Sequence, residues 1–272
     1  MNELARKSER FSGILLHPTA LPCSLVNGGF GEQARDWLKL LSNNGINVWQ
    51  FLPLSPTDNT GSPYSSPSGF ALNPWFLDAN DLLEEGFISE EVISEINKLE
   101  KGEKENKFNF EIADKRTQIL SEALIREWNN QNNKIHQEFN NWSKKQFWLE
   151  DHALFMEIRK KYKKKPWWEW PESFSKYNIN FLRSWRKQNE TQVLEHYLLQ
   201  WHLDRQWESV RKLARELGVL LFGDMPFYVS RDSVDVWSNR KLFSILSNGD
   251  LYQQSGVPPD YFSETGQLWG NP

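Results

Sequence analysis

The stretch Gly218 to Val229, which reads G-V-L-L-F-G-D-M-P-F-Y-V, indicates the class of fold. Val219 to Phe222 form a continuous apolar run between two glycines. The run is too short for a helix and predicts a strand buried on both faces, as in a parallel sheet. The helical pattern before it ends at Gly218, a residue type that commonly closes helices. Helix, tight turn and buried strand together make half of a β/α repeat.

Asp224 follows this strand at its carboxyl end. Folds built from β/α repeats keep their chemistry at this end of the strands, so the carboxylate is a candidate for substrate binding. An aspartate after a glycine also forms turns or caps the next segment. Local spacing leaves both interpretations open.

Two earlier strands fit the same fold. Ser12 to Leu16 and Val48 to Leu52 are short apolar runs, each followed closely by a proline. Between them, Glu32 to Asn43 predicts a helix, because its apolar residues recur every three or four positions. A strand, a helix and a strand within about forty residues have the size of one βαβ unit.

A glycine-rich link at residues 28, 29 and 31 precedes that helix. Phosphate-binding loops occupy the same place, but the spacing matches neither of the two common glycine motifs and no lysine follows. We therefore expect no nucleotide site there. His17, at the end of the first strand, is more often a structural histidine than a catalytic one in such a position.

The loop from Ser55 to Asn73 is rich in proline, serine, glycine and asparagine. Loops longer than ~12 residues in a compact domain usually carry function or are disordered. Because this one contains Tyr64, Phe70 and several hydroxyl groups, we interpret it as a binding loop. It follows the second strand directly, so we expect it at the same end of the sheet as Asp224.

The rest of the chain divides by pattern. Residues 78–207 are predicted to form a mainly helical inserted subdomain, with amphipathic helices near 111–128, 148–162 and 194–217. Residues 1–77 contain the first two β/α units and the binding loop, and residues 208–272 contain the third strand. After that strand we expect loops, with a small hairpin around Asn248–Asp250 and a stiff aromatic segment from Gly256 onward.

Composition excludes several classes of function. The 272 residues carry a net charge of -4, which gives no reason to expect nucleic acid as a partner. No segment approaches the ~18 apolar residues of a membrane helix, and the polar start predicts a cytoplasmic protein. The single cysteine, Cys23, cannot make an internal disulfide, and no cysteine and histidine residues have the spacing of metal ligands. Aromatic residues make up 14% of the chain, and composition cannot divide them between a core and sugar-stacking surfaces.

Several motifs, in order along the chain, resemble the amylomaltase (disproportionating enzyme) family of 4-alpha-glucanotransferases. The matching segments are His17–Pro22, Trp49–Thr57, Ser62–Ser68, Asn73–Pro74, Lys165–Pro171, Phe222–Val229 and Gly256–Pro272. The last segment, G-V-P-P-D-Y-F-S-E-T-G-Q-L-W-G-N-P, is long and unusual enough to make a chance match a poor explanation.

The resemblance implies a (β/α)8 barrel with inserted helical subdomains, of which this chain would hold about the first three strands. It implies transfer of α-1,4-glucan segments to glucose or another glucan, with maltooligosaccharides among the substrates and with no metal or organic cofactor. By position, Tyr64 would face the sugar at the cleavage subsite, Asp224 would hydrogen-bond substrate, and Ser62 would be a further substrate-binding residue. The remaining expected substrate-binding residues lie on the acceptor-side loop and beside it: Tyr261, Phe262 and Trp269.

Two departures from the family pattern stand out. Relatives carry an aromatic residue near the position of Asn59, so a remote glucan-stacking site is in doubt there. Retaining glycosyl transfer needs two carboxyl groups ~5–5.5 Å apart, and the family's motifs for them would lie beyond Pro272. We therefore expect a truncated form that has no catalytic pair. A non-catalytic α-glucan-binding fragment and a related α-glucan hydrolase remain alternatives.

Overall fold

The computed structural model describes residues 10–21, 28–58, 60–101 and 108–272. The chain forms two compact units. Unit 1 comprises residues 1–52, 75–119 and 202–225, and unit 2 comprises residues 53–74, 120–201 and 226–272.

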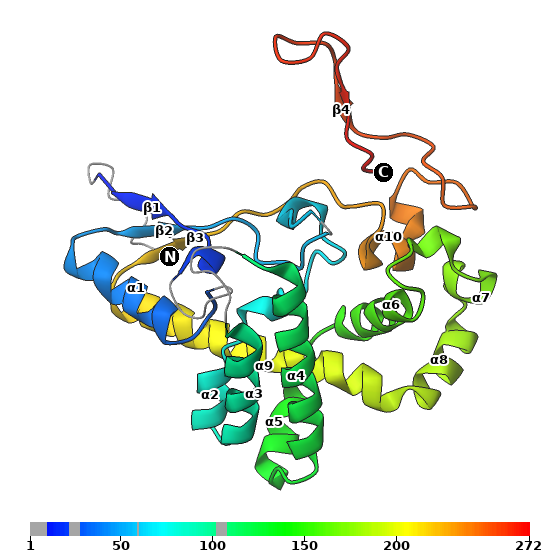
Figure 1. The fold of residues 1–272 in the computed structure, drawn as a ribbon. Coiled ribbons are helices and arrows are strands. Elements are labelled where there is room, and N and C mark those ends of the chain that lie inside the picture. The colour runs from blue at the N-terminus through cyan, green and yellow to red at the C-terminus, as the bar shows by residue number, and fades with distance from the viewer. Residues whose placement is uncertain (1–9, 22–27, 59, 102–107) are drawn as a thin grey trace. The chain divides into compact units, whose positions relative to one another are not determined.

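Unit 1 contains the parallel sheet and the helices that cover it (Figure 1). Its strands are β1 (Gly13–Leu15), β2 (Val48–Gln50) and β3 (Leu220–Phe222). Its helices are α1 (Glu32–Asn43), α2 (Ala79–Glu84) and α3 (Glu90–Glu100), with the first part of α4 (Phe110–Trp128) and the last part of α9 (Glu190–Glu216).

Unit 2 contains the remaining parts of α4 and α9 and most of the other helices. These are α5 (Asn133–Ser143), α6 (Leu149–Lys161), α7 (Glu172–Ser175), α8 (Ile179–Gln188) and α10 (Val234–Ser238). A two-stranded antiparallel ribbon, β4 (Gly256–Val257) and β5 (Gln267–Leu268), lies near the end of the chain.

The sheet has the order β1-β2-β3, and both pairs of strands are parallel. The predicted βαβ unit and the third strand are therefore confirmed, each strand being one or two residues shorter than expected. In the register, Leu15, Gln50 and Phe222 form one row across the sheet, and Ile14, Trp49 and Leu221 form the next. Because side chains alternate along a strand, these two rows face opposite sides of the sheet.

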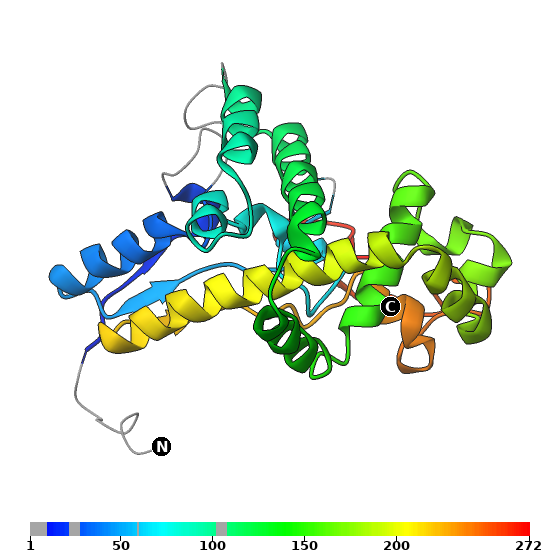
Figure 2. The same ribbon diagram turned by 90° about the horizontal axis from the view of Figure 1, so that it is seen from below.

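Helices α1 and α9 lie on the same face of the sheet (Figures 1 and 2). Trp49 is fully buried on this side, and Trp207 of α9 packs edge-on against Phe51, with ring centroids 5.5 Å apart. The seryl hydroxyl of Ser42 on α1 donates to the carbonyl of Leu217 just after α9. The apolar stripes of the two helices thus provide the cover that the sheet requires on this face.

The prediction that the third strand is buried on both faces is wrong for the described residues. Leu220 and Phe222 expose 46% and 58% of their surface. Both side chains point away from the face that α1 and α9 cover, and β3 is an edge strand of the sheet. Among the described residues, this apolar run is therefore covered on one side only.

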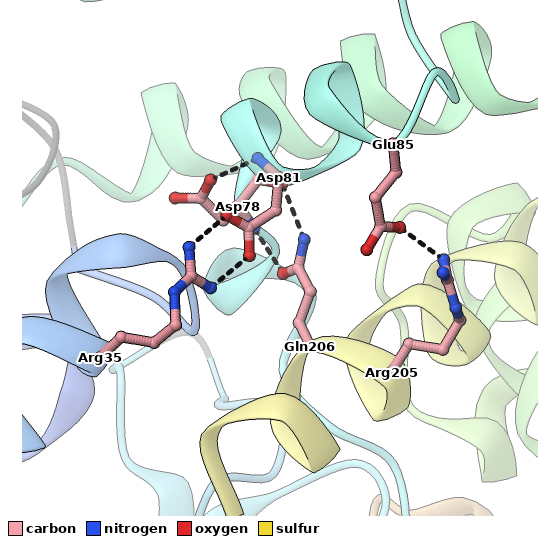
Figure 3. A network of polar contacts seen from close by, with 6 residues as sticks. All are labelled: Arg35, Asp78, Asp81, Glu85, Arg205 and Gln206. Carbon is pink, nitrogen blue, oxygen red and sulfur yellow. Dashed lines mark hydrogen bonds and ion pairs between the residues drawn. The ribbon is translucent and has the colours of Figure 1, made fainter. Parts of the chain in front are cut away.

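Buried and partly buried polar side chains join α1, α2 and α9 within unit 1 (Figure 3). Arg35 forms two hydrogen bonds to the carboxylate of Asp81, at 2.7 and 2.8 Å. The side chain of Asp78 caps α2 by accepting from the backbone N–H of Asp81, and its burial raises the pKa of that carboxyl. The side-chain amide of Gln206 accepts from the N–H of Asp78 and donates to its carbonyl, at 2.9 Å in both cases.

The glycine-rich link before α1 is explained by close packing rather than by a ligand. A Cβ at Gly28 would lie 2.2 Å from the carbonyl oxygen of Pro18, and one at Gly31 would lie 2.2 Å from the carboxylate of Asp78. Neither distance is sterically possible. His17 has a structural contact as well: its Nδ1 lies 2.8 Å from the hydroxyl of Thr19 at the start of a 3-10 turn.

The core of unit 2 is strongly aromatic. Phe155, Trp170 and Trp237 are buried together, with ring centroids 5.2 to 5.9 Å apart. Trp167, also buried, donates its indole N–H to the carbonyl of Arg231. The segment Trp167–Trp170 therefore packs in this core and holds the chain that follows β3.

The long helices agree with the predicted ones to within a few residues. Helix α1 has the predicted bounds, and α9 begins four residues earlier than predicted. Gly45 and Gly218 follow α1 and α9 with φ of 69°, the left-handed conformation typical of helix ends. Among the helices described, none has both the length and the apolar character needed to cross a membrane.

We predict that Gln206→Leu lowers the free energy of unfolding by about 2 to 4 kcal/mol, because it leaves a buried N–H and a buried C=O of Asp78 without partners. Urea unfolding followed by circular dichroism measures the change. Lys39→Gln is the control: it removes an ion pair whose side chains are more than half exposed, which contributes less than ~1 kcal/mol. Equal effects of the two substitutions would contradict the assigned role of Gln206.

A second prediction concerns His152 of α6, which is buried with its Nδ1 atom unpartnered among the described residues. Burial, and secondarily the nearby His196, lower its pKa to about 3. Because the unfolded chain binds this proton near pH 6.5, stability falls as the pH drops from about 7 towards 3. In His152→Leu, the free energy of unfolding should fall less steeply with pH. His202, whose pKa is also lowered by burial, retains part of the slope. Identical slopes in the two proteins would disprove the prediction.

Candidate functional site

The predicted sugar-facing loop is held in shape by Asp58. Its Oδ1 atom accepts hydrogen bonds from the backbone N–H groups of Thr60 and Ser62 and from the hydroxyl of Thr60, at 2.7 to 3.1 Å. The hydroxyl of Ser62 in turn accepts from the N–H of Tyr64 and caps the 3-10 turn Pro63–Ser65. The phenol of Tyr64 is left 44% exposed on a backbone that neighbouring side chains have fixed.

The second half of this loop is anchored to helices of unit 2. The carboxylate of Asp235 on α10 accepts from the N–H of Gly69 at 2.9 Å. Gln200 of α9 accepts from the N–H of Leu72 at 2.9 Å and donates to its carbonyl at 2.8 Å. Burial raises the pKa of the Asp235 carboxyl, which the backbone hydrogen bond from Gly69 partly offsets. Side chains of α9 and α10 thus hold the backbone of the loop at Gly69 and Leu72.

Asp224 lies two residues beyond β3, at the carboxyl end of the sheet in unit 1. The backbone pairing continues just to the strand's last residue, where the N–H of Phe51 donates to the carbonyl of Phe222. A Cβ atom added at Gly223 would lie 3.3 Å from the ring of Phe51, so a larger residue would be crowded there. Asp224 itself is exposed to solvent. This position suits a side chain that binds a ligand, and it equally suits a residue that forms a turn.

The predicted acceptor-side loop is the connection of the β4–β5 ribbon. The carboxylate of Asp260 accepts from the N–H groups of Phe262 and Ser263, at 2.9 and 2.8 Å, and shapes the tip. Tyr261 and Phe262 expose 96% and 87% of their surface, and their rings meet edge to face at 5.6 Å. The sequence predicted a stiff aromatic loop but missed the two short strands that support it.

Trp269 follows β5 and packs against a residue from the stretch after β3. Its ring lies 5.4 Å from that of Tyr228, and its indole N–H donates to the side chain of Gln267. Asn271 donates from its side-chain amide to the carbonyl of Val229. These contacts, all within unit 2, connect two of the segments whose motifs were singled out. Tyr228 and Gln267 were not predicted as site residues, and only the folded chain shows that they position Trp269.

A third set of contacts holds the chain between these segments. The guanidinium of Arg159, at the end of α6, forms an ion pair with Asp232, whose carboxylate also accepts from the N–H of Trp167. Burial raises the pKa of Asp232, and the charge of Arg159 opposes this shift. Arg231 stacks on Trp168 at 3.8 Å and donates to the carbonyl of Gly249. Arg159, in the basic last turn of α6, thus helps to hold the chain that follows β3 in place.

The predicted small hairpin is present in a reduced form. A single antiparallel bridge joins Ile245 and Leu251, and Gly249 turns the chain with φ of 90°. Asn59, where the missing aromatic residue was noted, lies outside the described residues. Among the residues that the structure describes, no three histidine, cysteine, aspartate or glutamate side chains gather in a way that could hold a metal ion.

The predicted site residues are therefore divided between the two units. Ser62, Tyr64, Tyr261, Phe262 and Trp269 belong to unit 2, on two separate loops, and Asp224 belongs to unit 1. Each lies on an exposed or partly exposed segment, and side chains hold the segments of unit 2 in place. This arrangement provides aromatic faces, a phenol, a hydroxyl and one carboxylate, which are groups that bind sugars.

Comparison with known proteins agrees with this chemistry. Residues 16–272 match the family described as 4-alpha-glucanotransferase. The 4-alpha-glucanotransferase of Synechocystis is 38% identical over 266 residues, which are 97% of this chain and 52% of that protein. The 4-alpha-glucanotransferase of Thermus thermophilus is 36% identical over 265 residues, 97% of this chain and 51% of that protein. The chain thus spans about half the length of the curated relatives it matches.

A solved structure is similar over the same extent. The amylomaltase from Streptococcus agalactiae, in complex with acarbose, superimposes on this chain with a TM-score of 0.90 at 30% sequence identity. The superposition includes 97% of this chain and 53% of the amylomaltase chain. The family match includes every predicted site residue, from Ser62 to Trp269. The chain therefore belongs to the 4-alpha-glucanotransferase family.

Proposed function

We propose that this chain provides glucan-binding elements of a 4-alpha-glucanotransferase, an enzyme that moves an α-1,4-glucan segment to glucose or to another glucan. The observation that carries the proposal is the family match along residues 16–272. The streptococcal relative binds acarbose, a maltooligosaccharide analogue, which supports α-glucans and maltooligosaccharides as the ligands. A cytoplasmic location stays a prediction.

In this proposal β1, β2 and β3 are the first three strands of a (β/α)8 barrel. Three consecutive parallel strands with helices on one face are what such a barrel begins with. Residues 78–207 are the inserted helical subdomain, between the second and third strands. The substrate site then lies at the carboxyl ends of the strands. Asp224 follows the carboxyl end of β3, and the loop that contains Tyr64 follows that of β2.

Each site residue has a proposed role that its surroundings support. Tyr64 contacts the sugar at the cleavage subsite and Ser62 is a further substrate-binding residue. Hydrogen bonds from Asp58 and Ser62 already hold the backbone of these residues, so little conformational entropy is lost on binding. Asp224 accepts hydrogen bonds from sugar hydroxyls. Tyr261 and Phe262, the exposed rings at the tip of the ribbon, cover the acceptor sugar and exclude water, and Trp269 flanks them.

The reaction proposed is a retaining double displacement. A carboxylate attacks the anomeric carbon, a glucosyl-enzyme forms, and a sugar hydroxyl of the acceptor displaces it in preference to water. The step needs a second carboxyl ~5–5.5 Å from the first as acid and base. Asp224 is the one carboxylate among the proposed site residues, so we give it a binding role and assign neither catalytic carboxyl to residues 1–272.

The test is a transfer assay with maltotriose. An enzyme that contains this chain together with the two catalytic carboxyl groups should release glucose and maltooligosaccharides longer than maltotriose, as seen by chromatography, whereas residues 1–272 alone should release neither. Glucose without longer products would favour a hydrolase, and binding without turnover would favour a glucan-binding protein.

In the same assay, Asp224→Ala should reduce turnover by about 10²-fold, the scale for losing a charged contact that strengthens in the transition state. Asp36→Ala, on the exposed side of α1 and paired with Lys39, is the matched control and should retain wild-type turnover. If Asp224→Ala has wild-type kinetics, the aspartate is a turn former.

A further prediction concerns the ribbon tip. Replacing Tyr261 and Phe262 by alanine should lower the ratio of transfer to hydrolysis several-fold, because water then reaches the intermediate more easily. The ratio is measured from glucose and maltooligosaccharide yields at equal substrate consumption. Since both rings are almost fully exposed, the unfolding temperature should hardly change. An unchanged product ratio would remove the proposed acceptor-side role.

A further inference from the structure

Unit 2 carries a pair of exposed phenylalanine rings that none of the proposed roles uses. Phe70, in the loop after β2, is 54% exposed, and Phe147, in the turn between α5 and α6, is 79% exposed. Their rings meet edge to face, with centroids 5.0 Å apart and planes at 78°. A single exposed phenylalanine is common on a protein surface, but two from distant segments in contact with each other need a reason.

The backbone beneath Phe70 is fixed on both sides. The N–H of Gly69 is held by the carboxylate of Asp235, and Leu72 is held by the two hydrogen bonds of Gln200. Between them Ala71 is buried and donates its N–H to the hydroxyl of Ser68. Phe70 is therefore presented to solvent by a rigid loop, and it does not collapse into the core with its neighbours.

Phe147 also stands on ordered backbone. Leu149, two residues on, is buried and begins α6, and the ring of Trp148 lies 5.7 Å from that of His152 inside the unit. The N–H of Gln146 donates to the carbonyl of Ser143 at the end of α5. The two helices thus hold the turn while its phenylalanine points outward.

The size and chemistry of the pair indicate its ligand. Two phenylalanine side chains provide at most a few hundred Å² of apolar surface, at roughly 200 Å² each. A stable protein interface needs about 800 Å² on each side, so the pair is too small for a protein partner. It is the right size for one or two sugar rings, whose C–H faces stack on aromatic faces while their hydroxyls remain in water.

We propose that Phe70 and Phe147 form a stacking platform that binds glucose units of an α-glucan. The identity of the ligand rests on the proposed function, whereas the platform itself is separate from the residues assigned to that function. Because Phe70 belongs to the same loop as Tyr64, a glucan chain bound by one of these residues is held close to the other. Rings that are already ordered lose little entropy on binding, which favours such a site.

The test is affinity electrophoresis of the full chain in native gels that contain soluble amylose, compared with gels without it. Phe70→Ala and Phe147→Ala should each weaken retardation about fivefold, the scale of one aromatic contact. Phe147→Trp should be retarded as the wild type is, because tryptophan keeps a flat aromatic face at this position. Phe11→Ala is the matched control, since Phe11 is 59% exposed but lies in unit 1, and it should bind as the wild type does.

The outcomes separate the platform from the proposed function. Wild-type retardation in the Phe70→Ala, Phe147→Ala double variant would overturn the platform and leave the proposed function intact. Loss of retardation with unchanged circular dichroism and unfolding temperature supports it. If the wild-type chain itself is not retarded, the platform is overturned, and the maltotriose assay then decides whether the proposed function fails as well.

Discussion

Two glutamine side chains on α9 support much of the irregular chain in this protein. Gln200 and Gln206 each pair with both the N–H and the C=O of one residue, Leu72 and Asp78 respectively. An amide can do this because it has a donor and an acceptor side by side, as a neighbouring strand would. A buried backbone group without such a partner costs about as much as a lost hydrogen bond. A long connection without regular structure can therefore pass over a helix and remain ordered.

The same constraint explains how functional groups can be exposed and yet fixed. Asp58, Asp235 and Asp260 each accept backbone N–H groups from the loop that carries a proposed site or platform residue. The loops are thus shaped by short side chains with one or two rotatable bonds. Tyr64, Phe70 and Phe262 then project from backbone that is already ordered. Such preorganisation is what a binding surface needs when its ligand is a flexible sugar chain.

Much of the fold could be predicted because its signals are local. Helices α1, α4, α6 and α9 were found from the spacing of apolar residues, and the three parallel strands from short apolar runs between turns. The site residues were named from a resemblance, in motifs that the family match covers. Burial was predicted less well. Leu220 and Phe222 have the composition of a doubly buried strand and are exposed on one side. An apolar residue records that a strand can be buried, but not what covers it.

The amino acids alone were enough for the three parallel strands, the four long helices and the family, since each depends on residues close together or on motifs in sequence. The folded chain was needed to show which groups hold the loops. Gln200 and Gln206 contact backbone 128 residues away, and Asp235 contacts backbone 166 residues away. No period or motif encodes contacts of that separation, because they depend on how helices pack. The pairing of Phe70 with Phe147 and of Tyr228 with Trp269 arises in the same way.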